Sequence, residues 1–254
     1  MHYYFLAASL PDIELGQEPE LSFSSLMLLF RENLSEDDMD DINRLRWLID
    51  IDNVHKFIKD EPLNPFGLLK RKEIEEALLN RTLLPDYVFD ILDQGDDHFY
   101  KIYLTFFRTE ATEEKGFLKR YFAFERSLRL CLAAVRAKDT GRDLSKELAD
   151  ADQSDFLVRA LIASKDASEP DFPFELRSLY DIVKNLSDDP FQQYCEIARY
   201  RFKKIGELAK DYPFSLEALM IYTLRLMLAE EWHLLNDEEG QKRLNALIHQ
   251  KETA

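Results

Sequence analysis

Apolar residues recur along most of the chain at the three- and four-residue spacing of an amphipathic α-helix. The clearest pattern lies between Thr112 and Asp139. There an apolar stripe with spacings of 4, 3, 4, 3 and 4 residues is formed by Phe117, Tyr121, Phe124, Leu128, Cys131 and Val135. Such a heptad stripe keeps one seam of a helix against a partner helix. Gly141 is expected to end this helix, because glycine readily adopts the left-handed backbone that closes helices.

Further helices are expected on both sides of this one. Ser35 precedes a run of acids, which suits a helix N-terminus, and Pro62 ends the helix that follows. The segment 213–235 is apolar nearly all round and is expected in the middle of the fold. The lead-in 1–21 favours neither strand nor helix. The remaining helices are predicted at 22–32, 65–78, 85–95, 99–107, 154–163, 174–186 and 191–209. The pattern therefore predicts an all-α protein with long antiparallel helices.

Composition narrows the fold further. The chain has seven glycines in 254 residues, well below the usual frequency of about 7%. β-Sandwiches, Rossmann domains and P-loops need more glycine for their turns and phosphate loops, so these classes are excluded. No run of 18 uncharged apolar residues suggests a membrane span, and the N-terminus lacks the basic flank of a signal peptide. With only two cysteines, both in apolar helical patterns, a cytoplasmic location is expected.

The charge balance bears on partners. Asp and Glu number 49 and Lys and Arg 33, for a net charge of −16. Such a surface repels nucleic acid, so no nucleic-acid partner is expected and a protein with basic patches is the more plausible one. The alternative is that the acidic excess serves solubility alone.

An internal repeat is suggested by two of the long helices. Leu128–Ala133 matches Leu224–Ala229 at five of six positions, and Leu45–Leu48 is a weaker echo. Each string embeds an arginine in an apolar helix. These three residues, Arg46, Arg129 and Arg225, are interpreted as equivalent structural arginines of a repeat, with Asp41, Glu125 and Glu217 as candidate acidic partners. We therefore expect one helical domain, 1–254, with three quasi-repeated units near 22–95, 97–165 and 171–250. A chance match between leucine-rich helices is the alternative.

These strings also resemble a known family. The segment Phe124–Arg129, followed by Val135–Lys138 and Gly141, resembles the helix motif of the C subunit of V-type ATP synthases, which is the d subunit in eukaryotic V-ATPases. Pro213–Ala218 resembles the opening of that family's last unit. His2–Pro11 resembles an uncharacterised bacterial family that is encoded beside V-type ATP synthase genes and regarded as similar to the C subunit.

The resemblance implies a mechanical role in proton or ion transport. In the V-type ATP synthases, the C subunit is a non-catalytic socket between the membrane rotor ring and the central shaft. The partners implied are therefore rotor-ring and central-shaft subunits, and the chain would be peripheral to the membrane at most, on the cytoplasmic face of the inner membrane. No enzymatic activity, catalytic residue, metal or cofactor is implied.

Two alternatives stay open. The first is a helical-repeat scaffold, unrelated to the ATPase, that binds peptides in a groove. The second is a metal-binding helical bundle, because Glu230 and His233 are three residues apart, as are Asp52 and His55. Di-iron bundles use paired Glu-x-x-His motifs with two further carboxylates. With 49 acids in the chain, such spacings arise easily by chance, so the metal site is the weaker hypothesis.

Overall fold

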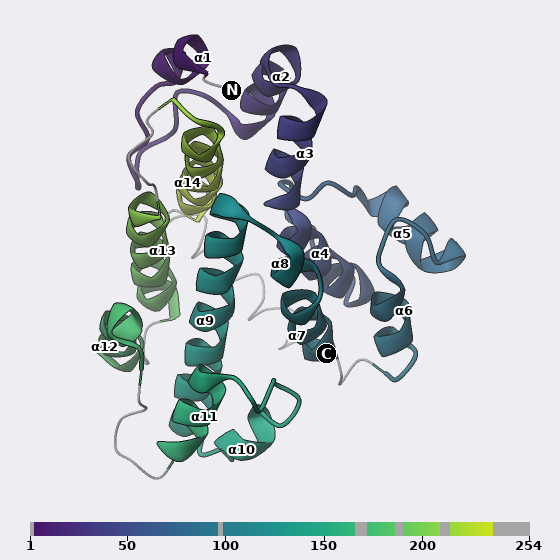
Figure 1. The fold of residues 1–254 in the computed structure, drawn as a ribbon, viewed down its shortest axis with the longest axis vertical. Helices are drawn as coiled ribbons and strands as arrows, with labels where there is room; N and C mark the ends of the chain where they lie inside the picture. The colour runs from purple at the N-terminus through teal and green to yellow at the C-terminus, as the bar shows by residue number, and fades with distance from the viewer. Residues whose placement is uncertain (1–2, 96–98, 166–171, 186–189, 209–213, 236–254) are drawn as a thin grey trace, which may run out of the picture. The chain divides into compact units, whose positions relative to one another are not determined.

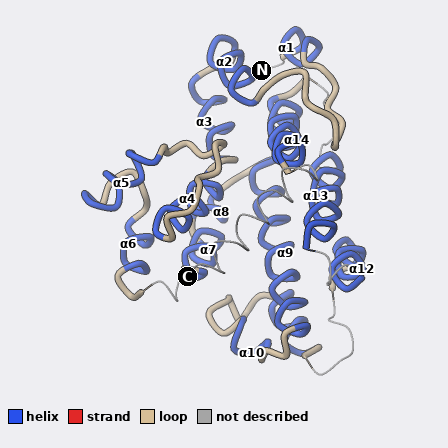
Figure 2. The backbone as a smooth tube through the Cα atoms, turned by 180° about the vertical axis from the view of Figure 1, so that it is seen from behind, coloured by secondary structure: helices blue, strands red, loops and turns tan. Residues whose placement is uncertain are grey.

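The computed structural model describes residues 3–95, 99–165, 172–185, 190–208 and 214–235, and it is helical throughout (Figures 1 and 2). No strand occurs in these residues, which confirms the all-α prediction. The chain divides into two compact units. Unit 1 combines Met1–Met39 with Asn185–Ala254, and unit 2 is the continuous segment Asp40–Lys184. These bounds differ from those of the three expected repeat units, and the repeat itself stays a prediction.

Unit 1 is built around α14 (Leu216–Leu234), which packs against α13 (Pro190–Glu207) and α2 (Phe23–Asn33). Ser215 caps α14 by accepting a hydrogen bond from the backbone N–H of Ala218 at 3.4 Å. As expected for a helix apolar nearly all round, α14 is buried on most of its surface, at Leu219, Met220, Ile221, Leu224, Leu226, Met227, Leu228 and Ala229. The lead-in forms a short helix, α1 (Tyr4–Ser9), and the N–H of Tyr3 donates to the carbonyl of Phe214 at 2.8 Å.

Unit 2 is organised by the longest helix, α9 (Gly116–Asp139). It packs against α7 (Tyr100–Arg108), α8 (Glu110–Glu113), α10 (Leu144–Glu147) and α11 (Phe156–Ala163). Five of the six residues of its heptad stripe are buried, and the sixth, Phe124, is half-buried. Gly141 follows with a φ of 67°, as the left-handed closing residue that the sequence predicts. The remaining helices of the unit are α4 (Trp47–Ile58), α5 (Arg71–Asn80), α6 (Asp86–Leu92), the short 3-10 helix η2 (Phe174–Leu176) and α12 (Arg177–Asn185).

One helix boundary was not predicted. Instead of a single helix between Ser35 and Pro62, the chain forms α3 (Glu36–Arg44) and α4, separated by a turn at Leu45 and Arg46. The guanidinium of Arg46 donates to the carbonyls of Phe66 at 2.6 Å and Gly67 at 2.8 Å. Arg46 therefore lies at the break before α4, rather than inside a long apolar helix.

Within the described ranges, no helix combines the length and the apolar character that crossing a membrane requires. The polar segment after Gly240 lies outside the described residues.

Candidate functional site

Two hollows in unit 2 are candidates for binding. The larger, here called the α7–α9 groove, has a volume of about 840 Å³. One wall is a single face of α7, formed by Lys101, Leu104, Thr105 and Arg108. The other is a single face of α9, and it is lined at the same three- and four-residue spacing by Lys119, Phe122, Ala123, Arg126, Ser127 and Leu130. The two helices pack against each other, and Ile91, Gln94, Ala111 and Thr112 add to the lining.

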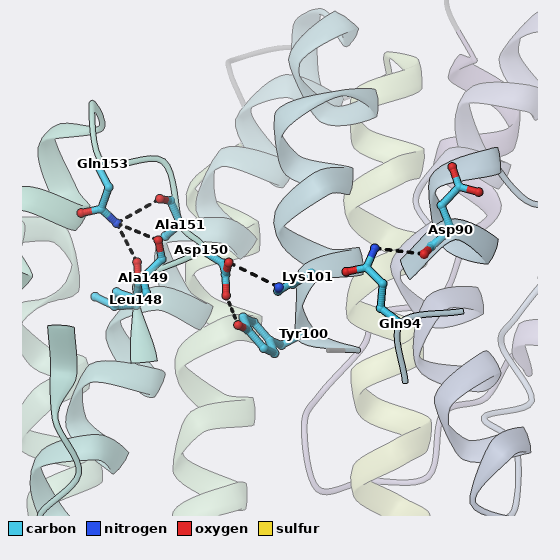
Figure 3. Close-up of polar contacts among 9 residues, drawn as sticks. All are labelled: Asp90, Gln94, Tyr100, Lys101, Leu148, Ala149, Asp150, Ala151 and Gln153. Atoms are coloured by element: carbon cyan, nitrogen blue, oxygen red, sulfur yellow. Dashed lines mark hydrogen bonds and ion pairs between the residues drawn. The ribbon is translucent and has the colours of Figure 1, made fainter. Parts of the chain in front are cut away.

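The segment between α10 and α11 forms a rim of the groove, and its backbone is held by its own side chains. Gln153 donates from its amide to the carbonyls of Leu148 at 2.7 Å and Ala151 at 3.0 Å (Figure 3). Asp150 accepts from the hydroxyl of Tyr100 and lies 3.5 Å from the ammonium of Lys101, which ties this segment to α7 (Figure 3). The rim is therefore formed before any partner binds.

Basic side chains are concentrated in the groove relative to the whole chain. Four basic and three acidic residues line it, in a protein whose net charge is −16. Lys101 pairs with Asp150, and Arg126 pairs with Asp155 at 3.0 Å. The other two cations, Arg108 and Lys119, are exposed and make no ion pair with any residue in the described part of the chain. Hydrogen bonds from Ser154 lower the pKa of Asp152, an acid of the same lining, and the charge of Arg108 adds to this effect, so a ligand would share this cation with Asp152.

The smaller hollow, here called the α4–α6 pocket, has a volume of about 350 Å³ and a mostly apolar lining. It is formed by α4, the loop before α5, the loop between α5 and α6, α6 itself and the junction of α7 with α8. Its lining consists of Trp47, Asp50, Ile51, Leu68, Leu69, Leu83, Leu84, Pro85, Tyr87, Val88, Phe106 and Glu110. Such a size and lining are typical of small-molecule sites.

Asp50 is the buried polar group of this pocket. Its side chain is 5% exposed, and its Oδ1 accepts from the backbone N–H of Leu69 at 3.1 Å. Burial raises the pKa of the Asp50 carboxyl from 3.8 to about 6, although the Leu69 N–H and the charges of Arg46 and Lys70 oppose this rise. A carboxyl group with such a pKa inside an apolar pocket is a frequent mark of a functional site.

The loop that covers Asp50 is fastened to α4 by polar side chains. Asn53 donates to the carbonyl of Asn64 at 2.9 Å and accepts from its N–H at 2.7 Å. Gly67 lies so close that a Cβ there would be 2.4 Å from Asn53 Nδ2 and 2.8 Å from Asp50 Oδ1. Any larger residue at this position must displace these side chains or the loop. The sequence predicted none of these contacts, although the polar cluster Asp50–His55 within an apolar helix is a visible sign of buried polar chemistry.

The three predicted repeat arginines have different surroundings. Arg129 pairs with Glu125 one turn away, as expected. Arg46 has backbone carbonyls as acceptors, and its expected partner Asp41 pairs with Arg44 instead, at 3.1 Å.

Arg225 departs furthest from the expectation. Its guanidinium carbon lies 3.9 Å from the ring centroid of Phe202, and its Nε finds no hydrogen-bond partner among the described residues. Burial lowers the pKa of Arg225, whereas the charge of Asp12 raises it. The expected partner, Glu217, lies eight residues earlier in the same helix, about 12 Å along its axis.

The residues of the predicted metal motifs have other local partners. Asp52 accepts a hydrogen bond from the hydroxyl of Tyr103, and His55 stacks on Phe99 with ring centroids 4.2 Å apart. Glu230 accepts from the backbone N–H of Phe23 at the start of α2. Among the described residues, no group of three or more His, Cys, Asp or Glu side chains is arranged to hold a metal ion. Asp96, Asp97 and His98, the polar cluster that follows Gly95, lie outside those residues.

Comparison with known proteins gives one family. Residues 1–253 match the model described as "Protein of unknown function (DUF2764)". The chain belongs to this family. An uncharacterised protein of Chlamydia pneumoniae is 27% identical over 255 residues, which cover 96% of both chains. Uncharacterised proteins of Chlamydia muridarum and Chlamydia trachomatis are 23% identical over 264 residues and 24% identical over 257 residues, and each match covers 96% of this chain. These matches cover 97% and 96% of the relatives. No solved structure matches the chain.

The family match corrects the resemblance to the C subunit of V-type ATP synthases. The model that covers nearly the whole chain describes a family of unknown function and carries no link to an ATP synthase or to proton transport, so the assignment to the V-type ATP synthase family is wrong. The strings behind it are only four to ten residues long, and combinations of apolar, charged and small residues of this kind occur in many amphipathic helices. The mechanical role between a rotor ring and a central shaft loses this support and stays an untested prediction.

Proposed function

We propose that this protein is a non-catalytic helical scaffold that holds a helical segment of a partner protein in the α7–α9 groove. The observation that carries the proposal is the shape of the groove, whose two walls are single faces of two adjacent helices. A groove of this kind accepts an amphipathic helix with its apolar side chains directed inward.

The chemistry of the groove supports the same occupant. The apolar part of the lining includes Ala123, which is exposed, and Leu104, which is half-buried, together with the buried side chains of Phe107, Phe122 and Leu130. Arg108 and Lys119 supply positive charge, for which acidic side chains at the edges of the segment are the complement. The partner segment is therefore amphipathic, with acidic residues beside its apolar face.

Site-specific photo-crosslinking in native cells tests the proposal. A benzoylphenylalanine at Ala123, an exposed position that lines the groove, should give a discrete adduct with one protein. The control is the same residue at Leu79, which is 81% exposed and lines neither hollow. Charge reversal by Arg108→Glu with Lys119→Glu should remove the adduct. An equal adduct from both positions, or none from Ala123, would contradict the proposal.

A further inference from the structure

The α4–α6 pocket has a different chemistry from the groove. Two of its lining residues, Asp50 and Glu110, are acids, and the lining contains no lysine, arginine or histidine. Arg46 and Lys70, the two cations whose charges act on Asp50, also have other contacts. Arg46 donates to the carbonyls of Phe66 and Gly67, and the Lys70 ammonium lies 3.4 Å from the carbonyl of Pro65. The pocket is therefore an apolar cavity with an acidic lining.

Aromatic rings complete the lining. Trp47, Tyr87 and Phe106 come from three different helices and all border the cavity. The faces of such rings attract cations, with tryptophan the strongest. The Trp47 ring already has a cation near it, because the guanidinium carbon of Arg44 lies 5.9 Å from its centroid. Burial, followed by the charge of Glu110, raises the pKa of Tyr87, so its hydroxyl stays neutral at physiological pH.

The mouth of the pocket includes a strained residue. Leu83 has a φ of 63°, in the left-handed region that leucine rarely adopts, and its side chain is 66% exposed. Holding an apolar side chain in water on a strained backbone is unfavourable, and such outliers concentrate at ligand-binding sites. An apolar ligand at the mouth would cover this side chain.

We propose that the α4–α6 pocket binds a small organic cation with an apolar body, an alkyl- or arylammonium, whose charge is balanced by Asp50 and Glu110. A carboxylate in an apolar cavity is unfavourable unless a positive charge compensates it, and a cationic ligand supplies that charge. An anionic ligand would add to the repulsion. This inference does not depend on the function proposed for the groove, because the two hollows share no lining residue.

Tryptophan fluorescence of the full chain tests this inference. The chain has two tryptophans, so the Trp232→Phe variant leaves Trp47 as the reporter. The variant is titrated with benzyltrimethylammonium and with neopentylbenzene, in which carbon replaces the charged nitrogen. The cation should bind at least about tenfold more tightly, a difference of about 1.4 kcal/mol. Equal binding of the two probes, or no change in Trp47 emission at millimolar cation, would overturn the inference.

Variants of the two acids test which residues balance the charge of the ligand. Asp50→Asn and Glu110→Gln should each weaken binding of the cation about fivefold or more and leave the neutral probe unchanged. Lys119→Ala, in the groove, should change neither. Glu110 is half-buried, so Glu110→Gln still decides the question if Asp50→Asn disturbs the fold. Saturation-transfer NMR on the unmodified chain gives a second measurement of binding. If neither carboxyl variant weakens binding of the cation, the inference fails.

Discussion

At the scale of the residue, Asp50 makes the stability of unit 2 depend on pH. Its pKa is 3.8 when unfolded and about 6 when folded, so between these values the folded chain binds more protons than the unfolded chain. The free energy of unfolding therefore falls as the pH rises from about 4 to 6. For a rise of about two pKa units, the loss is about 2–3 kcal/mol.

Asp50→Asn should remove this loss. The amide keeps an oxygen for the Leu69 N–H but cannot ionise, so the variant should gain stability relative to wild type as the pH rises from 4.5 to 7.5. Urea unfolding at several pH values measures the difference, with Asp40→Asn, at an exposed position, as the control. Parallel curves for wild type and Asp50→Asn would show that the Asp50 carboxyl titrates normally.

Gly67 gives a second prediction at this scale. A methyl group there meets Asn53 Nδ2 at 2.4 Å and Asp50 Oδ1 at 2.8 Å, so Gly67→Ala must displace the loop or the polar side chains beneath it. We expect a loss of about 2–3 kcal/mol in the free energy of unfolding. Gly206→Ala is the matched control.

Gly206 lies in the last turns of α13, and a methyl group added there would have nothing within 4 Å, so alanine should stabilise the helix by up to about 1 kcal/mol. Thermal unfolding of both variants should therefore show shifts of opposite sign. A Gly67→Ala variant as stable as wild type would mean that the loop is not fixed as described.

Side-chain pairs could be predicted from the sequence only where they are local. Glu125 and Arg129 are four residues apart on one helix, and helical geometry brings such residues together. The acceptors of Arg46 lie 20 and 21 residues away, in a loop whose path no sequence pattern reveals. The burial of Asp50 was not predicted for the same reason, because it depends on that loop.

At the scale of the element, α9 was predicted well because apolar residues recur at helical spacing within its own sequence. The break between α3 and α4 was missed because the same apolar spacing continues across it, and the turn is stabilised by contacts between Arg46 and a distant loop. Local sequence thus predicted that the segment is helical, whereas the position of this boundary depends on tertiary contacts.

The arginines of α9 and α14 give a prediction at this scale. Arg129 pairs with Glu125, which is fully buried, so Arg129→Met should cost about 3 kcal/mol by removing this ion pair from a buried carboxylate. Arg225 stacks on Phe202, and its Nε has no hydrogen-bond partner in the described residues, so Arg225→Met should cost less than about 1 kcal/mol.

Chemical denaturation of the two variants measures this contrast. Glu125→Gln combined with Arg129→Met should recover much of the lost stability, because the buried carboxylate charge is then gone. Equal costs for Arg129→Met and Arg225→Met would favour equivalent roles and would support the internal repeat.

At the scale of the whole molecule, the two units differ in how the chain builds them. Unit 2 is continuous from Asp40 to Lys184 and has its own buried core around α9, so a fragment of residues 40–184 should fold alone. Circular dichroism should show a helical fragment with a cooperative thermal transition. The fragment should also bind benzyltrimethylammonium with the affinity predicted for the full chain. A fragment without a cooperative transition would show that unit 2 needs unit 1.

The fold class could be predicted at this scale, but the family and the division into units could not. The fold class was inferred from the low glycine content and the helical periodicity of the whole chain, so an error in one segment changes the inference little. The division into units depends on which distant helices pack together, such as α2 with α14, and no pattern within either helix specifies its partner. The family resemblance rested on a few strings of four to ten residues, which are too short to identify a relative.

The discontinuity of unit 1 has a consequence for the order of events during synthesis. Leu26 and Phe30 of α2 are fully buried in the finished unit, which needs α13 and α14. Ribosomes add about 5–20 residues per second, so roughly 10–40 s separate the synthesis of α2 from that of α14. Unit 2 is made in that interval and can fold first. The N-terminal helices meanwhile wait with their apolar faces uncovered, and they are the part of the nascent chain on which chaperones and proteases have the longest time to act.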